Sequence, residues 1–107
     1  MTQLQELLAK VNAGTLWRGD VQSIANLKLN VHLVFQANHG SLDAAKALHE
    51  AVLGVGFNYS IHKDSASVMT WAHTVEGKTI TANNRNPARA WLIAIIKALI
   101  AQEKLND

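Results

Sequence analysis

The last third of the chain contains a helical segment that is apolar on nearly every side, and this feature most constrains the fold. Between residues 88 and 101, apolar residues recur at helical spacing in two neighbouring stripes. The first stripe comprises Ala88, Trp91, Leu92, Ile95 and Leu99, and the second comprises Ile93, Ile96 and Ile100. A small domain covers both stripes only if the helix lies under a sheet and against other helices, or against another chain. We therefore expect this helix to be central.

The same segment opens with a strong helix start signal. Asn86 is a good N-cap, because its side-chain oxygen accepts hydrogen bonds from free N–H groups of the first turn. Pro87 follows at the first helical position, where its missing N–H removes no bond. A ridge of small residues then predicts close packing against an Ala-rich helix over residues 42–53, or a dimer interface. The ridge comprises Ala90, Ala94, Ala98 and Ala101.

Composition indicates one folded domain spanning residues 1–107. The chain is 49% hydrophobic and 17% charged, which is typical of a globular protein. Its formal charge of +2 comes from scattered residues, so no basic footprint for sequence-specific nucleic-acid binding is expected. The absence of cysteine excludes disulfides and thiolate metal sites. The N-terminus does not resemble a signal peptide and residues 90–96 are too short to span a bilayer, so we expect a cytoplasmic protein without membrane partners.

Helices and strands are expected to be segregated along the chain. Residues 2–13 and 42–53 are predicted amphipathic helices, with Leu42, Ala45, Leu48 and Val52 as the buried stripe of the second. Residues 15–29 read as a loop followed by a short or irregular helix, and helix is favoured over strand for residues 30–38.

Three short strands are predicted between the helices. Residues 57–61 alternate between apolar and polar, residues 67–75 form a longer strand, and a tight Glu76-Gly77 turn leads into residues 78–82. A two-residue turn would pair His73 with Ile80. The fold class is therefore α+β, a three-stranded antiparallel sheet packed with helices in a small sandwich.

One candidate surface for partner binding lies in the loop after the first helix. Trp17, Arg18 and Asp20 follow one another closely there, and an exposed Trp beside Arg is typical of a binding hot spot. The alternative is that Trp17 folds back over the core as a lid. A second candidate surface is the outer strand face near His62, which the alternation places on the polar side of its strand. Trp71, on the next strand, is expected to cover the long helix.

A candidate anion site lies at the start of the long helix. Arg85 and Arg89 flank the free N–H groups of the first turn around Asn86, and such a set can hold a phosphate or a carboxylate. The alternative is that Arg89 pairs with a surface carboxylate and that Asn86 belongs to an ordinary loop and cap.

The histidines do not form a recognisable metal motif. His49-Glu50 resembles the start of a zinc-protease helix, but Leu53 stands where the second histidine is required. A cluster of His62 and His73 on adjacent strands is the remaining arrangement, and it would suit a metal-dependent hydrolase. We expect no metal, no cofactor and no catalytic residues, because no nucleophile elbow or phosphate loop is present either.

Two blocks of sequence resemble a phage protein family. Residues 40–53 and 86–103, with the Lys10-Val11-x-Ala13-Gly14 stretch that ends the first helix, are similar to the small phage "ABA sandwich" domain proteins. The resemblance implies a fold and a phage or prophage origin, with no catalytic residues to carry over. The usual Pro-Gly-Trp segment is replaced by Gly54-Val55-Gly56-Phe57, and residues 15–39 match poorly.

These observations favour a non-enzymatic phage or prophage accessory protein that binds a host macromolecule. The most concrete form is an inhibitor of a bacterial defence system that acts by steric occlusion, in the manner of an anti-CRISPR protein. Its partner would be a host protein or a protein–nucleic-acid defence complex, and the chain itself a monomer or a homodimer. The alternative function is a sponge for a small anion or nucleotide signal at Arg85 and Arg89.

Overall fold

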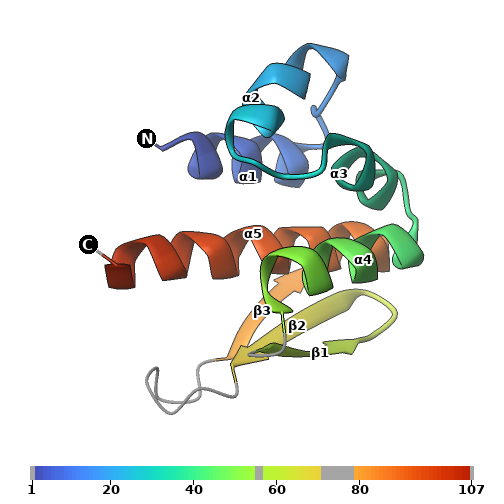
Figure 1. Ribbon diagram of the computed structural model, residues 1–107. Helices are drawn as coiled ribbons and strands as arrows, with labels where there is room; N and C mark the ends of the chain where they lie inside the picture. The colour runs from blue at the N-terminus through green and yellow to red at the C-terminus, as the bar shows by residue number, and fades with distance from the viewer. Residues whose placement is uncertain (1, 55–56, 71–78, 107) are drawn as a thin grey trace.

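The C-terminal helix, α5 (Pro87–Asn106), lies in the middle of the molecule, with a sheet on one side and helices on the other (Figure 1). The computed structural model describes residues 2–54, 57–70 and 79–106. The helices that precede α5 are α1 (Gln3–Ala13), the 3-10 turn η1 (Arg18–Asp20), α2 (Val21–Asn26), α3 (Val31–Asn38) and α4 (Leu42–Val52). The strands are β1 (Phe57–Ile61), β2 (Ser65–Thr70) and β3 (Thr79–Asn83). The expected α+β class, with its antiparallel three-stranded sheet, is confirmed.

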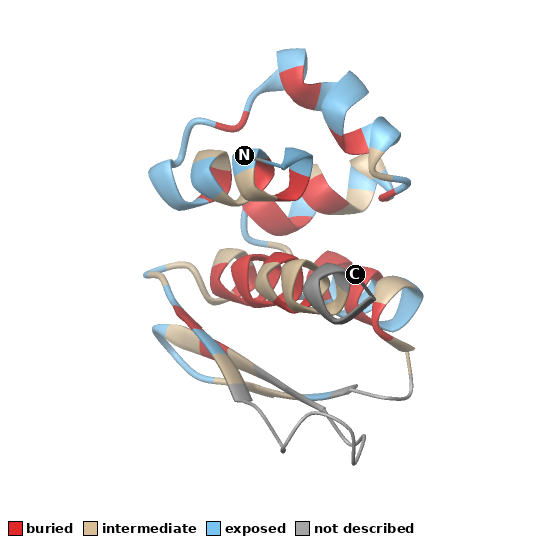
Figure 2. Cartoon of the chain, turned by 90° about the vertical axis from the view of Figure 1, so that its left-hand side faces the viewer, coloured by how far each residue is buried: buried red, intermediate tan, exposed pale blue. Residues whose placement is uncertain are grey.

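The burial of α5 explains its apolar sequence. The helix contacts β2 and β3 on one side and α1, α3 and α4 elsewhere on its surface. Residues 92–96 are each at most 1% exposed, so both apolar stripes are covered within one chain over this stretch. Figure 2 shows this run of buried residues between the N-terminal helices and the sheet. Because burial of an aliphatic side chain contributes about 1.5–3 kcal/mol, this one helix supplies a large share of the core.

Short polar signals determine where the other helices begin and end. Thr2 caps α1 in a reciprocal capping box with Gln5, and Gly14 ends the helix in the left-handed conformation at φ 72°. Asn30 and Ser41 accept hydrogen bonds from first-turn N–H groups and so begin α3 and α4. The helix expected over residues 30–38 is thus confirmed, and so is the short helix after the loop that begins at residue 15.

The sheet has the strand order β1-β2-β3, but the predicted register between the last two strands is wrong. Ile80 pairs with Val68, whereas a two-residue turn would pair it with His73. In the observed register Ala66 pairs with Ala82, and both small side chains are buried on the sheet that α5 covers. Small residues allow a helix to pack closely on a sheet. The residues of a turn do not predict this packing, so they could not predict the register. The predicted Glu76-Gly77 turn lies outside the described residues.

The structure also tests the predicted burial of Leu42 and the predicted packing of α4 against α5. Leu42, predicted to be buried, is 43% exposed, because it is the first residue of α4 and the inward positions of the first turn belong to Ala44 and Ala45. The expected contact between α4 and α5 is present. In the described ranges, no helix combines the length and the apolar character that crossing a membrane requires.

Candidate functional site

The Trp17 turn, defined as residues 16–21, connects α1 to α2. After Gly14, the N–H of Thr15 donates to the carbonyl oxygen of Lys10 at 2.9 Å, which closes the end of α1. Leu16 is buried and anchors the chain to the core. The next residue, Trp17, is extended, and its carbonyl oxygen accepts a hydrogen bond from the N–H of Asp20 at 2.9 Å. The chain therefore reverses direction within four residues.

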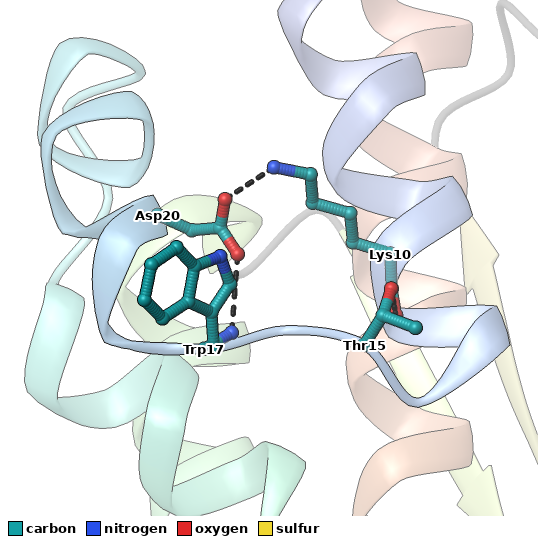
Figure 3. A network of polar contacts seen from close by, with 4 residues as sticks. All are labelled: Lys10, Thr15, Trp17 and Asp20. Atoms are coloured by element: carbon teal, nitrogen blue, oxygen red, sulfur yellow. Dashed lines mark hydrogen bonds and ion pairs between the residues drawn. The ribbon is translucent and has the colours of Figure 1, made fainter.

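Asp20 holds this turn together from the inside. Only 4% of the residue is exposed, and its Oδ2 accepts a hydrogen bond from the N–H of Trp17 at 3.1 Å. Its Oδ1 accepts a hydrogen bond from Nζ of Lys10, which reaches the turn from α1 (Figure 3). Asp20 was predicted to contact a partner. Its position corrects that prediction, since a buried carboxylate with two internal donors is a structural element of the turn.

The electrostatics of Asp20 follow from these contacts. Burial by itself raises the pKa of a carboxyl group, because it disfavours the charged form. The hydrogen bond from Lys10, the backbone N–H of Trp17 and the charge of Lys10 act in the opposite direction and prevail. The pKa of Asp20 therefore lies below its ordinary value of 3.8, and the carboxylate is ionised at neutral pH.

The indole of Trp17 lies on the outside of the turn. The residue is 66% exposed, so the alternative prediction of a lid over the core is wrong. A Cβ atom placed on Gly19 would lie 2.2 Å from Cζ2 of Trp17, so the ring packs directly over this glycine. Any larger residue at position 19 would displace the ring. Because Gly19 has no side chain, the indole of Trp17 can pack against its backbone.

The neighbours of Trp17 extend the exposed surface. Arg18 is exposed, and Val21 is 41% exposed one turn further along. Trp17, Val21 and Leu42 are the exposed large hydrophobic residues among those the structure describes. Two of the three thus belong to one short turn. We call Trp17, Arg18 and Val21 the Trp17 surface.

His62 is not part of this surface. It directly follows β1, and β1 lies on the far side of α5 from α2, the helix that follows the Trp17 turn (Figure 1). The side chain is exposed, as predicted, and its Nε2 lies 3.0 Å from Oγ of Ser60. The two candidate partner surfaces are therefore separate, and a single small epitope cannot include both.

The N-terminus of α5 is occupied by its own side chains. Oδ1 of Asn86 accepts hydrogen bonds from the N–H groups of Ala88 at 3.0 Å and Arg89 at 3.3 Å. The N–H of Asn86 donates in turn to Oδ1 of Asn84 at 2.9 Å. The predicted cap is confirmed, and the same bonds occupy N–H groups that an anion would need.

Arg89 is engaged at the junction of three helix ends. Its Nε donates to the carbonyl oxygen of Asn38, in the last turn of α3, at 3.0 Å. A Cβ atom on Gly14, which ends α1, would lie 3.8 Å from Nη1 of Arg89. A cation near helix C-termini is favourable, because the helix dipoles are negative there. In the structure, Arg89 donates to the backbone carbonyl oxygen of Asn38. The sequence had suggested an anion or a surface carboxylate as its partner. Arg85 is exposed.

One histidine, His49, belongs to an aromatic cluster in the core. His49 is 1% exposed, and its Nδ1 accepts a hydrogen bond from Nε1 of Trp91 at 3.3 Å. Tyr59 packs edge-on against His49 and lies 4.5 Å from Trp91 between ring centroids. This cluster joins α4, β1 and α5. Among the described residues no group of three or more His, Asp or Glu side chains could hold a metal. Trp71 and His73 lie outside these residues.

Sequence reasoning missed the roles of two residues: Lys10, which contacts the Trp17 turn from α1, and Val21, which lies within the turn. Lys10 lies ten positions before Asp20 and on another helix, so no local pattern links them. Val21 has the apolar character and approximate helical spacing of a core residue, yet it is exposed. The sequence feature that did indicate the site is the isolated Trp17-Arg18 pair soon after Gly14, where α1 ends.

Comparison with known proteins yields no match among family models, curated proteins or solved structures. The resemblance to phage ABA sandwich proteins therefore stays a prediction. The case for any function rests on the geometry of the chain itself.

Proposed function

We propose that this chain is a non-enzymatic binding protein that docks a partner protein on the Trp17 surface. One observation carries the proposal: Trp17, a residue that is 66% exposed, stands on a turn that buried Asp20 holds in place. Trp and Arg are the residues most enriched among binding hot spots. A turn that is ordered before binding loses little conformational entropy on docking, so more of the contact energy appears as affinity.

The resemblance to phage proteins supports a concrete form of this activity. A phage or prophage accessory protein would act in the cytoplasm of the bacterial host and occlude a surface of a defence complex, as anti-CRISPR proteins do. The partner would be a host protein, alone or in a protein–nucleic-acid complex, contacted on its protein surface. The scattered charges of the chain support contact with protein more than contact with nucleic acid.

Phage plating tests the proposal directly. The chain would be expressed in a bacterial strain whose CRISPR system restricts a phage, and plaques would be counted. We expect the wild-type chain to restore plating and Trp17→Ala to abolish that effect. Loss of one hot-spot residue of about 2 kcal/mol weakens a complex about 30-fold. Leu42→Ala is the matched control, since Leu42 is also an exposed large hydrophobic residue but lies on α4.

The outcomes separate clearly. Equal activity of Trp17→Ala and the wild-type chain would contradict docking on the Trp17 surface. Failure of the wild-type chain against a panel of defence systems would contradict the anti-defence form. In that case a purified complex with any other protein partner, lost on Trp17→Ala and kept on Leu42→Ala, would still support a binding protein.

The geometry gives less support to the alternative of a nucleotide sponge. The Asn86 side chain satisfies first-turn N–H groups of α5, and Arg89 binds the carbonyl oxygen of Asn38. An anion at this position would have to displace internal hydrogen bonds, each of which contributes about 1 kcal/mol.

A further inference from the structure

Away from the Trp17 surface, the structure has an open surface pocket of about 360 Å³. Four parts of the fold form its aliphatic wall: α1, the loop after α2, the end of α4 and the C-terminal half of α5. The aliphatic lining residues are Leu4, Leu27, Leu29, Val52 and Leu99. Small-molecule sites commonly have volumes of 300–1,000 Å³ and apolar walls with few polar groups.

Two of the described residues that line the pocket have polar side chains. Lys28, which is exposed, and Gln102, which is partly exposed, line the pocket beside the aliphatic residues. Among the described lining residues, Lys28 is the one with an ionisable side chain. An ammonium group is a compact positive charge that pairs with a single anionic head group. Aromatic side chains are missing from the described lining, so the pocket offers no stacking platform for a nucleobase.

The backbone at Lys28 has a conformation that normally favours glycine. Lys28 follows α2 in the left-handed conformation, with φ 62°. Its N–H donates to the carbonyl oxygen of Ala25, and that of Leu29 donates to Ile24, which together form a Schellman motif. Glycine, or sometimes asparagine, normally occupies this position, because a Cβ atom is disfavoured there. A non-glycine residue in a sparsely populated conformation is often linked to function.

We propose that this pocket binds an amphiphilic carboxylate with an aliphatic chain. The chain lies against the leucine and valine wall, and the carboxylate accepts hydrogen bonds from Lys28 and from the amide of Gln102. Binding combines burial of the alkyl chain with a charge-assisted hydrogen bond at the rim. The site does not depend on the Trp17 surface, and Trp17→Ala leaves it unchanged.

Matched eight-carbon probes test this assignment. Sodium octanoate, 1-octanol and octylammonium chloride would be titrated into the isotope-labelled chain, and leucine and valine methyl shifts would be followed by NMR. We expect saturable shifts at the lining residues, with octanoate binding about tenfold tighter than octylammonium. Equal binding of the two charged probes, shifts located elsewhere, or no saturation with octanoate would overturn the proposal.

Three variants separate binding from folding. Lys28→Asn removes the charge at a position that tolerates asparagine, so we expect an unchanged or higher Tm together with loss of the preference for octanoate. Gln102→Glu adds a negative charge on partly exposed α5 and should favour octylammonium. Lys63→Asn, which removes the same charge after β1 and outside the pocket, should bind octanoate like the wild-type chain. Loss of octanoate binding in Lys63→Asn, or its full retention in Lys28→Asn, would contradict the proposal.

Discussion

At the scale of single residues, the Trp17 turn combines an exposed aromatic ring with a buried charge. Asp20 receives hydrogen bonds from Lys10 and from the backbone of Trp17, and the ring of Trp17 lies over Gly19. The two sets of contacts have separate roles. Asp20 orders the backbone of the turn, and Gly19 leaves the space in which the ring of Trp17 lies. Substitutions at these positions therefore have distinguishable effects.

Asp20→Asn should lower the free energy of unfolding at pH 7 by about 1–3 kcal/mol, since it weakens hydrogen bonds to a buried group. The folded-state pKa of Asp20 lies below 3.8, so the ionised form stabilises the fold above that pH. This contribution is lost as the pH falls through the folded-state pKa. Urea unfolding of both proteins should give a constant difference from pH 7 down to about pH 5, and a shrinking one below pH 3.8.

Lys10→Met is the companion variant for this measurement. It removes the described side-chain partner of Asp20 and should reduce the same pH-dependent difference. A difference between wild type and Asp20→Asn that stays constant to pH 2 would contradict the role given to Asp20.

Gly19→Ala should move the indole of Trp17 with little effect on stability. The new Cβ atom would lie 2.2 Å from Cζ2, and the ring can swing outward because Trp17 is 66% exposed. We expect the indole N–H signal of Trp17 to shift in NMR spectra while that of buried Trp91 stays in place. The free energy of unfolding should change by less than about 1 kcal/mol. An unshifted Trp17 signal would show that the ring does not lie over residue 19.

At the scale of secondary-structure elements, Arg89 joins the ends of three helices. Its guanidinium group binds the carbonyl oxygen of Asn38 in α3 and lies beside Gly14 at the end of α1. Arg89→Ala should lower the free energy of unfolding by about 1.5–3 kcal/mol, the usual contribution of a hydrogen bond to a charged group. Urea denaturation measures this change.

Arg85→Ala is the matched control, because Arg85 is exposed four residues earlier. Its effect should remain within about 0.5 kcal/mol. Equal effects of the two substitutions would contradict a structural role for Arg89. A loss of phosphate binding in both variants, with stability unchanged, would instead favour the anion site.

At the scale of the whole molecule, α5 is the common core of the sheet and the N-terminal helices. Ile93→Ala should lower the free energy of unfolding by about 2–5 kcal/mol, because Ile93 is 1% exposed and its truncation leaves a cavity in the core. Ile100→Ala, at a partly buried position of the same stripe, should have a smaller effect. Thermal unfolding followed by circular dichroism provides the comparison, and equal effects would argue against cover of the second stripe within the chain.

The element order and most helix boundaries could be predicted from the sequence, because local rules decide them. Caps at Ser41 and Asn86 act within one turn, so residue type indicates where those two helices begin. The two apolar stripes of α5 also required cover on both sides. Of the candidate site, local patterns located the exposed Trp17 and its neighbour Arg18.

The tertiary structure decided everything that depends on residues distant in the sequence. The register of β2 and β3 brings buried Ala66 opposite buried Ala82 on the sheet that α5 contacts, and no turn signal encodes that pairing. The burial of Asp20 depends on Lys10, and the engagement of Arg89 depends on Asn38. Contacts between separate elements form only once the chain has collapsed, so their geometry is set by how whole elements pack.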